Sequence, residues 1–174
     1  MSFDELWPTS ARVRYDRRAL ADLDLPASTV DTLCEVGLPV PIAPYKYVWS
    51  FGFPPCPTTP TRMFHGDDSS VVLGGDSVSV VAARERTGEV FVVPTSSNRP
   101  PMYANASLLA FLDVFAVYAE GYARTCEILR SRAHPKAKNS ALVEIRKQGR
   151  VRMKECDRSA LRRRENFWPQ FMTI

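Results

Sequence analysis

Apolar residues recur at steps of three and four along residues 108–129, which predicts a helix with one apolar side. The stripe consists of Leu108, Phe111, Leu112, Phe115, Tyr118, Ala119, Tyr122, Cys126 and Leu129. Asn105-Ala106-Ser107 supplies a capping residue at its start. We expect this helix to run to about Arg132, to bury the whole stripe and to cover one face of a sheet. His134 before Pro135 then reads as a C-terminal cap or a surface residue.

Valine-rich segments separated by turn residues precede this helix. Residues 70–73, 77–84 and 89–93 are predicted strands, with a turn over residues 85–88 between the last two. Neighbouring strands joined by such short turns favour an antiparallel meander over parallel strands with crossover helices. The expected fold class is therefore α+β, with a central, mainly antiparallel β-sheet packed by helices.

Two further helices are predicted on either side of this region. Ser28-Thr29-Val30-Asp31 resembles a variant capping box, and Gly37 followed by Pro39 gives a stop, with Leu38 folding back on Leu33. Residues 137–156 favour a helix despite Gly149 in its middle. Alternating apolar residues leave a β-hairpin across Gly149 as the competing interpretation.

Every odd position of residues 45–53 is aromatic, flanked by prolines. On a strand, these side chains share one face, and the prolines favour an edge. Such a face is more often core than exposed, because large exposed apolar patches are rare, but an exposed binding face stays open.

The chain of 174 residues is consistent with one domain over residues 1–174. Its N-terminus has no apolar leader, its longest apolar run is too short for a bilayer, and its four cysteines never pair as C-x-x-C. We expect a cytoplasmic protein with reduced, mostly buried thiols and no membrane partner. The net charge is +4, yet residues 1–87 carry 8 basic and 11 acidic side chains, whereas residues 88–174 carry 15 and 8.

Motifs of catalysis are largely missing. The sequence has no phosphate-binding glycine loop, no G-x-S-x-G elbow and no complete zinc-deaminase ligand set. His65, Asp67 and Asp68 could form a metal or acid–base site, but Gly and Asp are the residues that turns select, so a solvated turn is favoured. We therefore expect no enzyme activity, no catalytic or metal-binding residue and no cofactor.

The basic C-terminal third offers a different candidate. Residues 124–174 carry 14 Lys and Arg against 5 Asp and Glu. Such a surface could contact phosphates, although a solvated helix face is the favoured interpretation. A nucleic-acid-binding accessory protein is thus the alternative function.

Several motifs, in order along nearly the whole chain, together resemble the SUKH superfamily. They are Leu25-Pro26, the stop from Leu33 through Val36-Gly37-Leu38-Pro39, the aromatic segment, Val72-Leu73-Gly74, the predicted strand Ser77–Arg84, Thr87-Gly88-Glu89-Val90, and Asn105-Ala106-Ser107-Leu108 with Phe111. The ending from Asp157 to Leu161 with Phe167-Trp168 resembles the fourth, largely actinobacterial subgroup.

This resemblance implies a fold like that of the yeast cell-wall synthesis regulator and, in bacteria, an immunity role. Such proteins bind and neutralise polymorphic toxins, often nucleases or nucleic-acid deaminases. We therefore expect a non-catalytic protein-binding module with a cognate toxin as partner; a nucleic acid or small substrate is not expected. Because aromatic and Arg side chains often anchor interfaces, the predicted contacts are Tyr45, Tyr47, Trp49, Phe51, Asn98 and Arg99. The net positive charge departs from the acidic character common in nuclease inhibitors. It leaves open an acidic-half interface, an acidic toxin or another role.

Overall fold

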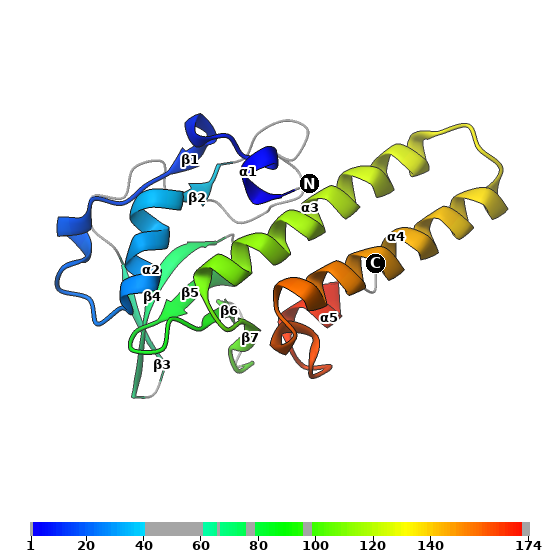
Figure 1. Ribbon diagram of the computed structural model, residues 1–174. Coiled ribbons are helices and arrows are strands. Elements are labelled where there is room, and N and C mark those ends of the chain that lie inside the picture. The colour runs from blue at the N-terminus through cyan, green and yellow to red at the C-terminus, as the bar shows by residue number, and fades with distance from the viewer. Residues whose placement is uncertain (1, 41–60, 66, 76–78, 96–98, 172–174) are drawn as a thin grey trace.

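An antiparallel sheet forms the centre of the protein in this computed structural model, which describes residues 2–40, 61–65, 67–75, 79–95 and 99–171 (Figure 1). Within this described part the sheet has five strands in the order of the sequence, β3-β4-β5-β6-β7. Their bounds are β3 Arg62–His65, β4 Asp68–Gly75, β5 Ser79–Arg84, β6 Val90–Pro94 and β7 Met102–Asn105. The predicted α+β class with an antiparallel sheet is confirmed, and β3 and β7 are additions to it.

Two register shifts, in β4 against β5 and in β7 against β6, each insert an extra residue into the sheet. The extra residues are Leu73 and Ala104, both fully buried in the core. The predicted turn between β5 and β6 is also confirmed, and it contains two residues with positive φ, Arg86 at 69° and Gly88 at 72°.

One face of the sheet is covered by the first half of α3 (Leu108–Arg130). The helix begins as predicted, because the Ser107 hydroxyl accepts a hydrogen bond from the Ala110 amide at 3.2 Å. Phe111, Leu112 and Phe115 are buried in the same core cluster as the alternate residues of the strands. The helix ends at Arg130, two residues before the expected end.

The N-terminal segment packs beside α3. It contains α1 (Phe3–Leu6) and a two-stranded antiparallel pair, β1 (Arg12–Val13) with β2 (Leu38–Pro39). The Trp7 ring stacks on Phe115 of α3 at 5.1 Å between centroids, which ties this segment to the core.

The helix before Gly37 has the predicted end but a different beginning. α2 (Ala27–Asp31) continues as a wider π-helical turn over Thr32–Val36 and stops at Gly37, whose φ is 83°. The capping box expected at Ser28 is wrong. Pro26 precedes the helix without a side-chain cap, so Ser28 lies inside the first turn.

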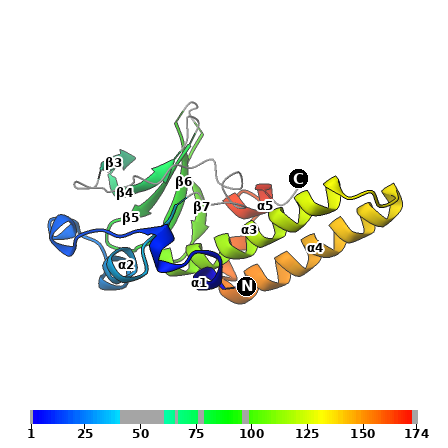
Figure 2. The ribbon, with the colours of Figure 1, turned by 90° about the horizontal axis from the view of Figure 1, so that it is seen from above.

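Residues 135–156 form a helix, α4 (Pro135–Cys156), and the alternative hairpin across Gly149 is wrong. His134 caps its beginning instead of the end of α3, with Nδ1 accepting from the Lys136 amide at 3.3 Å. Helices α3 and α4 form an antiparallel hairpin whose far end projects well beyond the sheet (Figures 1 and 2). We call residues 121–150 the arm. After α4, a 3-10 turn (Ser159–Leu161) and α5 (Phe167–Phe171) return the chain to β7.

The cysteines are less buried than expected. Cys34 and Cys126 are half-buried, and Cys156 is exposed; all three are free thiols. Cys56 lies outside the described residues.

Candidate partner-binding surface

Most of the predicted contact residues lie outside the part of the chain that the structure describes. Tyr45, Tyr47, Trp49 and Phe51 fall within residues 41–60, and Asn98 falls within residues 96–98. Arg99 is described and exposed. A contact role for these six residues therefore stays a prediction.

The segment that could have formed a metal or acid–base site joins two strands, with His65 at the end of β3 and Asp68 at the beginning of β4. Asp67 lies between β3 and β4, and both Asp67 and Asp68 are exposed. Asp68 forms an ion pair with Arg84 at 3.1 Å. Among the described residues, no group of three His, Cys, Asp or Glu side chains is placed to hold a metal ion. The favoured interpretation of this segment as a turn agrees with its position.

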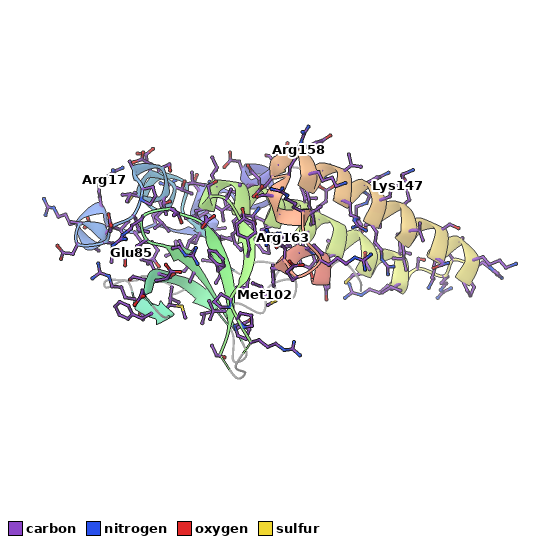
Figure 3. All side chains as sticks on the ribbon, turned by 90° about the horizontal axis from the view of Figure 1, so that it is seen from below. Arg17, Glu85, Met102, Lys147, Arg158 and Arg163 are labelled. Carbon is purple, nitrogen blue, oxygen red and sulfur yellow. The ribbon has the colours of Figure 1, made fainter. Side chains whose placement is uncertain are left out.

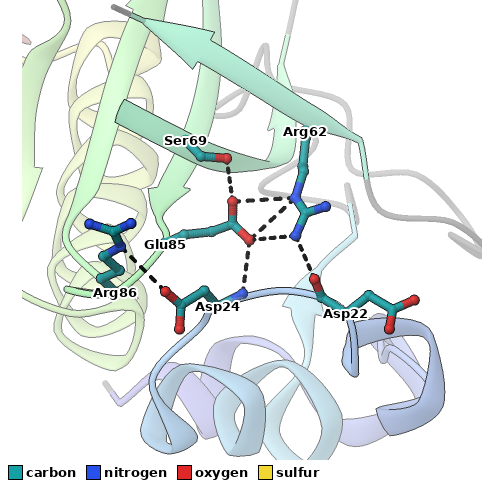
Figure 4. A network of polar contacts seen from close by, with 6 residues as sticks. All are labelled: Asp22, Asp24, Arg62, Ser69, Glu85 and Arg86. Carbon is teal, nitrogen blue, oxygen red and sulfur yellow. Dashed lines mark hydrogen bonds and ion pairs between the residues drawn. The ribbon is translucent and has the colours of Figure 1, made fainter. Parts of the chain in front are cut away.

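Near this connection, the carboxylate of Glu85 is the polar group with the most hydrogen-bond partners (Figure 4). The side chain is only 7% exposed, although it follows the end of β5. Its Oε1 accepts hydrogen bonds from Arg62 Nη2 at 3.0 Å and from the Asp24 amide at 2.9 Å. Its Oε2 accepts from the Ser69 hydroxyl. The network links β3, β4 and β5 to the N-terminal segment.

This environment keeps Glu85 ionised. Burial alone would raise its pKa, but the hydrogen bonds from Arg62, Ser69 and the Asp24 amide together outweigh burial and lower the pKa. A general base needs an accessible lone pair to take a proton. Both oxygens of Glu85 are already engaged, so this buried carboxylate acts as a structural clamp.

A second buried network holds the C-terminal segment against the sheet. Asp157 Oδ2 accepts hydrogen bonds from Asn105 Nδ2 and from the Ala106 amide, each at 3.0 Å. Asn105 in turn accepts from the Trp168 indole at 2.8 Å, and Asn105 and Trp168 are 0% and 1% exposed. Burial would raise the pKa of Asp157, but hydrogen bonds from Ser159, Ala106 and Asn105 together lower it. Asn105, Asp157 and Trp168 all belong to the motifs behind the family resemblance, and all three act as scaffold.

The apolar stripe of α3 continues beyond the part of the helix that is buried against the sheet. Its buried residues end at Ala119, whereas Tyr122 and Leu129 are 36% and 56% exposed and Cys126 is half-buried. The prediction that the whole stripe is buried is therefore wrong. The physical reason is geometric, because the second half of the helix packs along α4 and projects past the sheet (Figure 2).

This uncovered part of the stripe forms an apolar groove between α3 and α4, with a volume of about 290 Å³. We call it the arm groove. It is lined by Val117, Tyr118, Gly121, Tyr122, Thr125, Cys126, Leu129, Ile145, Arg146, Gly149 and Met153. Burial raises the pKa of Tyr118 to about 12, so its hydroxyl remains protonated at neutral pH. Among the lining residues that the structure describes, Arg146 is the one with a charged side chain.

The arm is strongly basic around this groove. Residues 121–150 carry eight Lys and Arg and two Asp and Glu, which gives the arm a net charge of +6. Because the net charge of the whole chain is +4, the remaining residues together carry −2. The structure describes every residue of the arm, and none of the eight Lys and Arg side chains forms an ion pair with a described residue. Lys147 is among those that project into solvent (Figure 3). The arm thus combines an uncovered apolar floor with uncompensated positive charge.

Sequence reasoning did not find the arm groove, although both of its signals were present. The apolar stripe was assigned to the core along its full length, and the positive charge was attributed to the C-terminal third as a whole. Only the place where the sheet ends separates the buried part of the stripe from the exposed part.

Among the described residues, no helix combines the length and the apolar character that crossing a bilayer requires.

Comparison with protein families places nearly the whole chain in a known family. The family model described as SUKH-4 immunity protein matches residues 2–173, which is nearly the whole chain. Comparisons with curated proteins and with solved structures gave no significant match. The family match agrees with the motif order, and the scaffold networks explain what several of those motif residues do. The chain therefore belongs to the SUKH-4 immunity protein family.

Proposed function

We propose that this protein neutralises a polymorphic toxin of the nuclease or nucleic-acid deaminase type by binding it directly, without covalent chemistry. The family match over residues 2–173 is the observation that carries the proposal. The polar clusters support it, because the buried carboxylate of Glu85 is saturated by protein donors. A protein that acts by binding needs a surface complementary to its partner and no free catalytic group.

Co-expression tests this function. The toxin domain encoded beside this protein is induced in a host that lacks the pair, with and without the protein. Growth should be restored only when the protein is present, and the two should co-purify as a 1:1 complex. Equal killing in both strains would refute the proposal.

A second candidate is binding to nucleic acid, which the eight Lys and Arg side chains of the arm favour. Phosphate contacts release counterions, so the affinity for a 20-nucleotide RNA or DNA duplex should fall steeply with salt. No retention of either nucleic acid at about 50 mM salt would remove this candidate.

A further inference from the structure

We propose that the arm groove is the docking site for the toxin, and that its occupant is an amphipathic helix of the toxin with an apolar ridge flanked by carboxylates. The proposal rests on the function proposed above and adds where and by what chemistry the partner is held.

The first argument is that no third element covers the apolar side of the two-helix arm among the described residues. Two antiparallel helices contact each other along one seam, and an apolar side that reaches beyond the seam needs another element to cover it. In the groove, Leu129 and Tyr122 of α3 are 56% and 36% exposed, while Ile145 of α4 is buried between the two helices. A helix laid along the groove would cover this floor in the way that ridges of side chains pack into grooves.

The second argument is charge. The arm carries +6, its cations form no ion pair with any residue that the structure describes, and Arg146 lies in the groove lining itself. Carboxylates that flank the apolar ridge of a partner helix would meet these cations and would speed association. The arm accordingly selects an acidic partner surface, which resolves how a net basic protein can act by binding.

The same features disfavour two other occupants. A second copy of the chain would bring two arms of +6 together, and like charges repel. A nucleic acid would satisfy the cations, and the exposed ring of Tyr122 could stack on a base, but the polar sugar-phosphate backbone would leave the aliphatic floor around Leu129 without an apolar partner. The groove floor therefore favours a polypeptide.

Two variants test the groove in different ways. Leu129→Gln replaces an exposed apolar side chain of the floor with a polar one. Gly149→Leu places a side chain in the groove, and it replaces a mid-helix glycine with a better helix former, so the arm remains helical. The matched control is Leu109→Gln, which changes a leucine of α3 that is 50% exposed but lies at the other end of the helix.

The measurement is isothermal titration of each variant with the catalytically inactivated toxin domain. Both groove variants should bind at least tenfold more weakly than the wild type, and the control should stay within twofold. Wild-type affinity for both groove variants would overturn the docking site and leave the proposed function intact. Absence of binding by the wild type would overturn both.

Two parallel measurements identify the other occupants. Sedimentation of the wild type as a dimer that Gly149→Leu converts to a monomer would assign the groove to a second copy. Binding of a 20-nucleotide RNA that Leu129→Gln abolishes, with toxin binding unchanged, would assign it to nucleic acid. Either result would contradict the proposal.

Discussion

Removal of the Glu85 side chain should loosen the attachment of the N-terminal segment to the sheet. The carboxylate accepts from Arg62, Ser69 and the Asp24 amide, and it is 7% exposed. Glu85→Ala takes away all of these acceptors at once. Ser69 and the Asp24 amide are then left without this partner in a place that water reaches poorly.

The magnitude follows from the partners. A hydrogen bond to a charged group contributes about 1.5–3 kcal/mol net. Arg62 is 41% exposed at its side chain and can recover part of its share from water, so it contributes little to the loss. We expect the free energy of unfolding to fall by about 3 kcal/mol in total. For a chain of this length, that corresponds to a melting temperature lower by about 6–12 °C.

Thermal and urea unfolding followed by circular dichroism measure this change. The matched control is Asp24→Ala, which keeps the backbone amide that donates to Glu85 and removes only an exposed pair with Arg86 at 3.4 Å. This control should change the unfolding free energy by less than about 0.5 kcal/mol. A loss in Glu85→Ala no larger than that of the control would refute the clamp.

The pH dependence of stability tests the role of the Glu85 carboxylate independently. The pKa of Glu85 is lowered in the folded protein, so its contribution is present above the unfolded pKa of about 4.3 and is lost as pH falls through the folded value. Glu85→Gln cannot titrate at this position. Its stability should therefore decline less than that of the wild type between about pH 5 and pH 3, and an identical decline would contradict the assignment.

Three further substitutions test the scaffold. Gly37→Ala should lower the free energy of unfolding by about 2 kcal/mol, because φ is 83° there and the new Cβ would lie 2.8 Å from the Val13 carbonyl oxygen; an unchanged urea midpoint would contradict this. Gly121→Ala should raise it by about 0.5–1 kcal/mol, since the new Cβ would meet Ile145 at an ordinary 3.7 Å and alanine favours the helix; a lower midpoint would show that the helices pack more closely. Trp168→Phe should cost about 2–3 kcal/mol, because the indole donor to the fully buried Asn105 is lost; thermal unfolding at the wild-type temperature would rule out that role.

Local signals in the sequence were sufficient for the helix boundaries that have a chemical cause. Ser107 caps α3 as predicted, and Gly37 ends the helical turn before β2 because its backbone adopts a positive φ. The capping box at Ser28 failed because the helix starts two positions earlier, directly after Pro26, which leaves Ser28 inside its first turn.

Short elements that depend on tertiary pairing were missed. β3 and β7 have four residues each and show no alternation of apolar and polar residues strong enough to stand out. They are strands because β4 and β6 offer them edges to pair with. Pairing with a neighbouring strand is a tertiary effect, and a segment of four residues carries too little pattern of its own to reveal it.

The position of the arm groove could not be predicted from the spacing of apolar residues. The same 3.6-residue stripe runs from Leu108 to Leu129, and nothing in the pattern marks Ala119 as the last buried residue. Whether an apolar position is core or interface depends on which element lies over it. That information comes from the arrangement of α3, α4 and the sheet in space (Figures 1 and 2).

Titration of the toxin's activity with the purified protein tests the central claim most directly. If the protein acts by direct binding, activity should fall linearly with added protein and reach its minimum at one equivalent, and the toxin should regain activity after the complex is dissociated. Loss of activity at a small fraction of an equivalent, with a lasting change in the toxin's mass, would mean that the protein modifies its partner covalently and would contradict the account.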